Sequence, residues 1–186
     1  MSLHLIVGPM WAGKSSELRR HVLRARAADR SVVVIKHDKD LRYTSDGKLT
    51  THDQLTVEAE LASRLAPIAE WAAGHDLVVV EEVQFFADVE DVVAFVRVVL
   101  AAGRQLVMAG LDGTYERQPW PVTSALFPLA RRVEKLLAVC VRCKKADAAY
   151  TAYRGPRPGS VVNPGIRGYQ ACCEACWTPP EYLVDQ

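Results

Sequence analysis

A phosphate-binding pattern lies close to the N-terminus of the chain. The Gly-x4-Gly-Lys-Ser pattern comprises Gly8, Pro9, Met10, Trp11, Ala12, Gly13, Lys14 and Ser15. It directly follows the apolar run of residues 3–7, which predicts a strand. Where such a loop opens into a helix, its backbone N–H groups face a polyphosphate, Lys14 reaches the β- and γ-phosphates, and the Ser15 hydroxyl can bind Mg²⁺. The sequence therefore predicts a nucleoside-triphosphate site.

Two carboxylates follow a second apolar run. Residues 77–80 read Leu-Val-Val-Val, and Glu81 and Glu82 come next. Successive strand residues point to opposite faces, so the two side chains are expected to serve different purposes. One can face Mg²⁺ through water while the other accepts the proton of the attacking nucleophile. The alternative is a pair of solvated glutamates at the end of a strand.

Four cysteines form two Cys-x-x-Cys pairs. Cys140 and Cys143 are separated from Cys173 and Cys176 by 29 residues, an arrangement typical of a tetrahedral Zn²⁺ site. Four protein ligands leave no open position, so we expect a structural metal rather than a catalytic one. Disulfides are the alternative, and a reducing cytosol disfavours them. Cys172 is left over, either as a bystander or as a competitor for the place of Cys173.

The phosphate loop, the glutamates and the cysteines need elements that position them. Apolar runs alternate with helical segments as far as residue 139. Strands are predicted at 3–7, 31–36, 77–80 and 105–111, and helices at 16–28, 58–73 with an interruption at Pro67, and 89–102. This alternation predicts an α/β fold with a parallel sheet covered by helices on both faces. Ligands then bind at the carboxyl ends of the strands, where the phosphate loop and the glutamates should meet.

Two segments have no regular pattern. Residues 37–56 are polar, and a loop of this length is usually functional or mobile. Residues 154–168 are rich in Gly and Pro; their backbone could bind the edge of a flat base, or they could form a surface loop without such a role. Because the composition changes at Cys140, we expect a nucleotide-binding α/β domain over residues 1–139 and a small zinc-binding domain over residues 140–186.

Length and composition limit the class of protein. The 186 residues, 49% hydrophobic and 24% charged, fit a soluble α/β domain with a small appendage. A net charge of +1 gives no reason to expect a nucleic-acid partner. No apolar stretch approaches the roughly 18 residues of a membrane helix, and we expect a cytoplasmic protein. The basic residues expected to form a solvated helix face are Arg19, Arg20, Arg24 and Arg26.

Six motifs, taken in order, resemble the type II thymidine kinase family over nearly the whole chain. They are the phosphate loop, Lys36 to Tyr43, Thr51 to Asp53, Glu82 to Phe86, Leu111 to Tyr115, and the two Cys-x-x-Cys pairs. The resemblance implies a RecA-like P-loop domain and a zinc-binding lasso domain that closes over the nucleoside. It also implies transfer of the ATP γ-phosphate, with Mg²⁺, to the 5′-hydroxyl of thymidine or deoxyuridine in nucleotide salvage for DNA synthesis. A homotetramer and feedback by thymidine triphosphate are implied as well.

The same resemblance implies roles for single residues. Glu82 would be the general base that takes the 5′-hydroxyl proton, and Arg42 would join Lys14 at the phosphates. Glu81 and Gln84 would belong to the nucleotide side of the site. An apolar wall for the base would come from Met10, Phe85, Leu111 and Trp120, with Thr151 close to the base. The lasso would hold the thymine through the main chain of Val161, Val162, Asn163, Pro164 and Gly165, and through Tyr169.

The chain departs from the family pattern at two positions. Glu81 stands where the family usually has Asp, so its carboxylate is one methylene further from the backbone. Pro164 stands where a second lasso glycine is common, and it removes an N–H group. Two other functions stay open at this point. One is a P-loop ATPase whose zinc unit binds nucleic acid, and the other is a nucleoside-binding regulator without catalysis.

Overall fold

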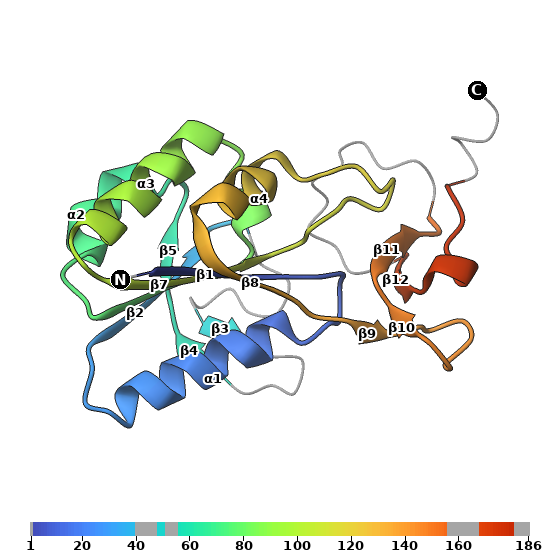
Figure 1. Cartoon of the computed structure of the whole chain (residues 1–186), viewed down its shortest axis with the longest axis horizontal. Coiled ribbons are helices and arrows are strands. Elements are labelled where there is room, and N and C mark those ends of the chain that lie inside the picture. Colours follow the sequence, from blue (N-terminus) through green and yellow to red (C-terminus); the bar gives the residue numbers. More distant parts are fainter. Residues whose placement is uncertain (1, 40–47, 51–55, 156–167, 181–186) are drawn as a thin grey trace.

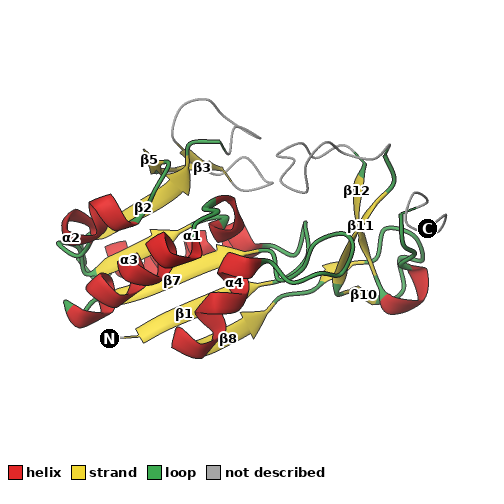
Figure 2. Ribbon diagram, turned by 90° about the horizontal axis from the view of Figure 1, so that it is seen from above, coloured by secondary structure: helices red, strands yellow, loops and turns green. Residues whose placement is uncertain are grey.

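Six parallel strands form the central sheet of the computed structural model, which describes residues 2–39, 48–50, 56–155 and 168–180. Their order across the sheet is β5-β2-β6-β7-β1-β8, and every neighbouring pair is parallel. The predicted parallel α/β sheet is confirmed (Figures 1 and 2). The strands are β1 (Ser2–Val7), β2 (Val32–His37), β5 (Glu60–Ala62), β6 (Leu77–Val80), β7 (Gln105–Gly110) and β8 (Ala130–Lys135).

Helices cover both faces of this sheet. Helix α1 (Lys14–Arg26) lies on one face, where Leu18 and Val22 pack among Ile6 and Val107. The opposite face packs against three further helices, and their contacts include the fully buried Phe95. The side chains alternate along β1 because successive residues point to opposite faces. The three helices are α2 (Ala69–Ala72), α3 (Val89–Ala101) and α4 (Pro121–Leu126).

The helix predicted over residues 58–73 is wrong in its first half. The chain there forms β5, which pairs with β2 at the edge of the sheet, and becomes helical only at the 3₁₀ turn η1 (Ala66–Ile68), whose Pro67 stands in the first turn. The backbone N–H groups of Leu65 and Ala66 donate to the Asp91 carboxylate at 2.7 and 3.2 Å. Pairing with a neighbouring strand and this distant carboxylate outweigh the local helical pattern.

Two short strands and two 3₁₀ turns complete this part of the chain. The predicted loop 37–56 contains β3 (Lys48–Thr50), which pairs antiparallel with β4 (Thr56–Glu58) at the end of that loop. Turn η2 (Val83–Phe85) follows β6, and η3 (Phe127–Leu129) leads from α4 into β8. None of the helices within the described ranges has the length and apolar character needed to cross a membrane.

A small unit follows β8 and carries the cysteines. Strand β9 (Ala138–Val139) pairs with β10 (Asp147–Ala148), and β11 (Tyr150–Tyr153) pairs with β12 (Tyr169–Cys172), both antiparallel. Turn η4 (Glu174–Cys176) carries the last cysteine. The unit lies beyond the β1 and β8 end of the sheet in Figure 1. The division of the chain at residue 139 stays a prediction. This unit is called the cysteine unit below, and Thr151 and Tyr153 are buried in it. Its buried apolar cluster comprises Ala138, Cys140, Ala148, Ala152, Ala171, Cys172 and Cys173.

Candidate functional site

The phosphate loop joins β1 to α1 in a conformation that depends on glycine. Gly8 has a φ of +148°, and a Cβ atom there would overlap the carbonyl oxygen of Leu136. Gly13 has a φ of 84° in the left-handed region and directly precedes α1. Side chains rarely tolerate that region, so glycine is needed at this turn. No side chain caps the N-terminus of α1, whose positive end therefore faces the loop.

The Lys14 ammonium is buried and folds over this loop. It donates hydrogen bonds to the carbonyl oxygens of Pro9 at 2.7 Å and Gly8 at 3.2 Å. Ser15 turns towards the sheet, and its hydroxyl donates to Oε1 of Glu81 at 2.5 Å. This bond connects the start of α1 with the end of β6. The structure thus brings together the lysine, the serine and the first glutamate of the sequence prediction.

The two glutamates diverge because β6 ends at Val80 and the backbone turns sharply at Glu82. Glu81 and Glu82 are both buried, but Glu82 has a left-handed backbone, with φ 51° and ψ 52°. Its carboxylate accepts a short hydrogen bond from the Gln84 amide, while Oε1 of Gln84 accepts from the backbone N–H of Leu111 at 3.1 Å. The different surroundings expected for the two carboxylates are present. Their cause is the sharp turn at Glu82 rather than the alternation of an unbroken strand.

Predicted wall residues lie around the Glu82 turn. Phe85 is buried in η2, with its ring centroid 6.4 Å from that of His37 at the end of β2. Leu111 is held through Gln84, as described above. Trp120 precedes α4 and is buried, and its indole N–H has no hydrogen-bond partner in the described part of the chain. These residues come from the carboxyl ends of three neighbouring strands, as the fold predicts.

Thr151 connects the cysteine unit to the phosphate loop. Its hydroxyl accepts a hydrogen bond from the backbone N–H of Met10 at 3.1 Å, across 141 positions of sequence. Thr151 is buried on β11, and Ala12 of the loop packs against the buried side chains of the cysteine unit. The cysteine unit therefore contacts the loop that would enclose phosphate at both Met10 and Ala12.

Arg117 makes a second connection that sequence reasoning did not identify. It lies in the segment after β7, and its guanidinium stacks 3.8 Å from the ring centroid of Tyr150 and 4.8 Å from that of Trp177. Two hydrogen bonds, of 3.0 and 2.6 Å, join it to the Glu174 carboxylate. This pairing raises the pKa of Arg117 and lowers that of Glu174. The partners are distant in sequence, so no local pattern could have indicated them.

Tyr169 lies in an aromatic cluster. Its ring centroid is 4.7 Å from that of Tyr153, its partner in the β11–β12 register, and 5.9 Å from that of Tyr115. Tyr115 and Tyr153 were not predicted site residues, because their proximity depends on this register. Arg42 and the segment Val161 to Gly165, including Val162, Asn163 and Pro164, lie outside the described residues. Their predicted roles stay predictions.

The four predicted cysteines come together in the small unit. The Sγ atoms of Cys140, Cys143, Cys173 and Cys176 all lie within 4.8 Å of one another. The N–H groups of Cys143 and Cys173 lower the pKa of the Cys140 thiol to about 6, whereas the hydrogen bond to the Cys173 thiol and burial raise the pKa of Cys176 to about 12. Four sulfurs at this spacing suit a soft tetrahedral cation that replaces their shared protons.

Cys172 is not part of this group. Its side chain is fully buried among the alanines of the cysteine unit, and burial raises the pKa of its thiol. The geometry therefore supports Cys173, rather than Cys172, as the fourth member of the group.

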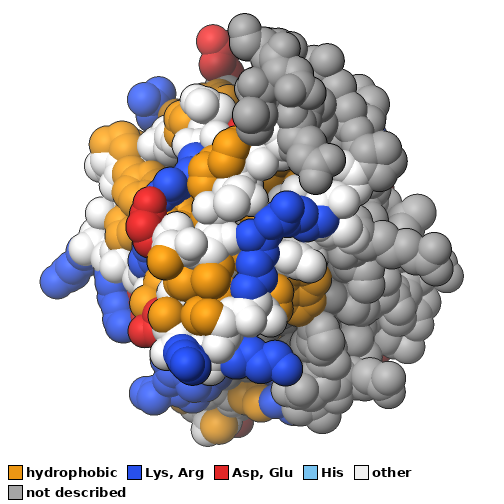
Figure 3. Space-filling model, turned by 90° about the vertical axis from the view of Figure 1, so that its right-hand side faces the viewer, with side chains coloured by type: hydrophobic (Ala, Val, Ile, Leu, Met, Phe, Trp, Pro, Cys, Tyr) orange, Lys and Arg blue, Asp and Glu red, His pale blue; other side chains and the backbone are white. Residues whose placement is uncertain are grey.

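Figure 3 shows the end of the molecule that carries the unit, where apolar side chains lie interspersed with lysines and arginines.

Comparisons with known proteins agree with this arrangement. The family model described as "Thymidine kinase" matches residues 1–177. The cytosolic thymidine kinase of Homo sapiens is 39% identical over 175 residues, which cover 94% of this chain and 72% of that protein. The thymidine kinase of rabbit fibroma virus is 36% identical, with 94% and 95% covered. The flagellar accessory protein FlaH of Methanocaldococcus jannaschii, 14% identical with a TM-score of 0.53 over 74% of this chain and 72% of FlaH, shares the fold alone.

Proposed function

The chain belongs to the thymidine kinase family, and on that premise we propose that its site transfers the γ-phosphoryl group of ATP to the 5′-hydroxyl of thymidine. The chain is a kinase that phosphorylates thymidine, a reaction of nucleotide salvage. The donor, the metal ion and the roles of single residues are the proposed part. The observation that carries them is the hydrogen bond from Ser15 to Glu81, which joins the phosphate loop to the end of β6.

The phosphate loop is proposed to hold the triphosphate of ATP. The first N–H groups of α1 and the Lys14 ammonium supply positive charge there. Lys14 would exchange its bonds to the Gly8 and Pro9 carbonyls for bonds to phosphate oxygens. Mg²⁺ bound beside the Ser15 hydroxyl and the Glu81 carboxylate would neutralise charge on the phosphates. Glu81 already reaches Ser15, so the additional methylene, relative to the usual Asp, fits this arrangement.

Glu82 is proposed to accept the proton of the 5′-hydroxyl. The left-handed turn moves its carboxylate away from Ser15 and towards Gln84, on the side where Phe85 and Leu111 lie. The Gln84 amide donates to that carboxylate and so fixes its orientation. A carboxylate has two oxygens that can accept several hydrogen bonds, so one bond from the amide is compatible with a second from a hydroxyl. Gln84 then acts by positioning Glu82 rather than by binding ATP.

Thymidine is proposed to lie between the sheet edge and the cysteine unit. Phe85 and Trp120 offer flat apolar faces for a base, and the unpaired indole N–H of Trp120 can donate to it. Met10, Leu111, Thr151 and Tyr169 complete the proposed wall with the main chain of Val161 to Gly165. Arg42 is proposed to approach the transferred phosphate. The same site would accept deoxyuridine, which differs from thymidine by one methyl group.

We propose that the four cysteines hold one structural Zn²⁺. The small set of alanines and cysteines buried in this unit supplies little apolar stabilisation, and a metal would supply the remainder. A cytoplasmic location, a homotetramer and feedback by thymidine triphosphate are proposed from the family alone.

A donor and acceptor assay tests the reaction. Purified protein is given ATP and Mg²⁺ with thymidine, deoxyuridine or single-stranded DNA, and both ADP and nucleoside monophosphate are quantified. Thymidine should yield equal amounts of ADP and thymidine monophosphate, and Glu82→Gln should lose both. ADP release stimulated by DNA, without nucleoside monophosphate, would instead support an ATPase. Thymidine should also slow amide exchange at Val161 to Gly165 more than ATP alone does.

A further inference from the structure

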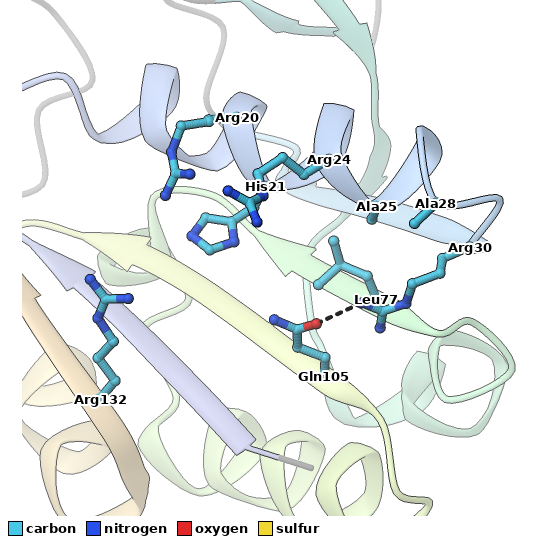
Figure 4. Close-up of a pocket in the computed structure, with 9 residues that line it drawn as sticks. All are labelled: Arg20, His21, Arg24, Ala25, Ala28, Arg30, Leu77, Gln105 and Arg132. Atoms are coloured by element: carbon cyan, nitrogen blue, oxygen red, sulfur yellow. Dashed lines mark hydrogen bonds between the residues drawn. The ribbon is translucent and has the colours of Figure 1, made fainter.

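An arginine-lined cavity of about 390 Å³ lies beneath α1, away from the proposed active site. Figure 4 shows Arg20 and Arg24 projecting from α1 towards the sheet, with Arg132 of β8 on the other side of the cavity. Leu77 and Gln105, the first residues of β6 and β7, also line it. The cavity therefore lies at the amino ends of the strands, whereas the phosphate loop follows the carboxyl end of β1. With Arg30, these arginines define the arginine pocket.

Nearby carboxylates neutralise only part of its charge. Arg20 pairs with Glu17, and Arg132 donates to Glu134 at 2.9 Å. Arg24 makes no hydrogen bond or ion pair with a residue in the described ranges, and Arg30 makes no ion pair there. A further carboxylate, Asp76, is held by two bonds from Ser31 and by Arg104 at 3.3 Å. Four guanidinium groups thus face one cavity with two direct carboxylate partners between them.

Helix electrostatics explains only some of these arginines. Basic residues in the last turn of a helix interact favourably with its negative end, which accounts for Arg24 and for Arg26 outside the pocket. Arg132 comes from a strand and Arg30 from the turn after the helix, so neither belongs to that pattern. The sequence analysis expected a solvated helix face here. Arg20, Arg24 and Arg26 are indeed exposed, and Arg20 and Arg24 also line the cavity together with two arginines from other elements.

Two hydrogen bonds fix the orientation of the Arg30 side chain. Its guanidinium donates to Oε1 of Gln105 and to the Asp76 carbonyl, both at 2.8 Å. A guanidinium has five N–H donors, so these two bonds fix its plane and leave donors free. Fixed guanidinium groups recognise phosphate through paired hydrogen bonds. The volume exceeds what a bare phosphate needs and matches small-molecule pockets, while Ala25, Ala28 and Leu77 supply an apolar part.

We propose that the arginine pocket is a second anion site, separate from the phosphate loop, which binds the phosphate group of a small phosphate monoester. Arg24 and Arg132 would contact the phosphate from α1 and β8, while Arg30, drawn at the other end of the cavity, would contact the remainder of the monoester (Figure 4). The pocket and the phosphate loop lie towards opposite ends of α1, because α1 begins at Lys14 and the cavity is lined by its second half.

Calorimetric titration of the full chain tests this site. Mg²⁺ and a non-hydrolysable ATP analogue are present throughout, so that the phosphate loop is occupied. Inorganic phosphate and phenyl phosphate are titrated separately as probes of free phosphate and of a monoester. We expect saturable binding of phenyl phosphate at one site per chain, weakened about tenfold or more in Arg24→Gln and in Arg132→Gln, since each removes a charged hydrogen bond.

Arg26→Gln is the matched control, because Arg26 is an exposed arginine of α1 that does not line the cavity. It should change the dissociation constant less than about twofold. Equal melting temperatures of the three variants would exclude misfolding as the cause. If inorganic phosphate binds and phenyl phosphate does not, the anion site is supported and its ligand is free phosphate rather than a monoester. No saturable binding of either probe, or binding that Arg24→Gln and Arg132→Gln leave unchanged, overturns the proposal.

Discussion

The sheet and the cysteine unit are stabilised in different ways. The largest fully buried side chains, among them Phe95, Leu106 and Met108, all belong to the sheet, its helices and the segments that connect them. Each such side chain stabilises the fold by about 1.5–3 kcal/mol relative to an exposed one. In the cysteine unit the buried side chains are mainly alanines and cysteines, besides Thr151 and Tyr153, and Val139 and Val141 stay exposed. We therefore expect its fold to depend on a metal held by the four cysteines and on contacts with the sheet.

Because the two regions are stabilised differently, we expect them to have different roles in the reaction. The sheet provides a rigid edge that positions Lys14, Ser15 and the glutamates. The cysteine unit contacts the rest of the chain through Thr151, which bonds to Met10, and through Tyr150, Trp177 and Glu174, which bind Arg117. Mutations in the sheet edge should therefore alter the chemical step, whereas mutations in the cysteine unit should alter metal content and thymidine binding.

Of all the variants considered, one that lacks a cysteine of the metal group should show the largest effect, and its structural effect should be confined to the cysteine unit. Structural zinc contributes about 10–16 kcal/mol of apparent binding energy in small zinc domains, so Cys173→Ser should unfold the cysteine unit and abolish most thymidine turnover. Metal analysis should find less than one zinc per chain, while the far-UV circular dichroism of the sheet and helices persists. Cys172→Ser is the control and should keep its zinc. Zinc lost only from Cys172→Ser would show that Cys172 is the ligand.

Glu82→Gln should affect the chemistry without altering either region's fold. Glutamine keeps the size and hydrogen bonding of the side chain but cannot accept the hydroxyl proton. We expect kcat to fall by about 10²–10⁴-fold, with little change in thymidine and ATP binding. Steady-state kinetics together with equilibrium binding separates these quantities. Glu81→Asp is the comparison and should keep substantial activity, whereas near-normal turnover in Glu82→Gln would assign the base to another residue.

Lys14→Ala should act through the phosphate loop. It removes the ammonium that is held over the Gly8 and Pro9 carbonyls. A single such charge contact contributes about 2.7–4 kcal/mol to transition-state stabilisation, so turnover should fall by about 10²–10³-fold. Melting temperature and zinc content should match the wild type. A folded variant that keeps more than about a tenth of the activity would contradict the phosphate-loop assignment.

Sequence analysis could predict the elements whose chemistry is local. The phosphate loop, the glutamates after β6 and the four cysteines each follow from short spacings, and the parallel sheet follows from alternating apolar runs. The helix over residues 58–73 was partly wrong, because β5 is decided by its pairing with β2. A strand at the edge of a sheet gains its stability from a neighbour that no local pattern reveals.

The connections between the two regions could not be predicted for the same reason. The bond between Met10 and Thr151 spans 141 positions, and the arginine pocket combines α1 with β8. Arg117 has a left-handed φ of 61°, which favours glycine or asparagine in other turns. No sequence pattern around it indicates aromatic partners. Tertiary register alone brings these groups together.

Arg117→Lys should loosen the contact between the regions with a moderate effect. Lysine keeps the charge but loses the planar stacking on Tyr150 and Trp177 and the paired bonds to Glu174. Exposed ion pairs and cation–π contacts are each worth about 1 kcal/mol or less, so KM for thymidine should rise up to about tenfold while kcat changes little. Arg97→Lys, at an exposed position of α3, is the control. An unchanged KM would contradict a positioning role.

The smallest expected effect is a pH dependence of stability that arises from His4 on β1 and His21 on α1. The rings of His4 and His21 lie 5.1 Å apart, and burial lowers the pKa of each below 6.5. Charged neighbours on this side are Glu17 and Arg20 of α1 and Arg132 and Glu134 of β8. The folded state therefore binds protons less readily than the unfolded chain.

The free energy of unfolding should consequently decrease as the pH falls below about 6.5, because the unfolded state then gains more protons. The lowered pKa of Glu17 lies below 4.5, so its contribution is lost only in more acidic solution. Urea unfolding at about pH 7.5 and about pH 5.5 measures the change, with zinc content checked at both. His21→Gln should reduce the pH dependence without removing it, since His4 still titrates. His75→Gln, which alters a histidine outside this pair, should leave it unchanged; an identical slope in His21→Gln and the wild type would refute the assignment.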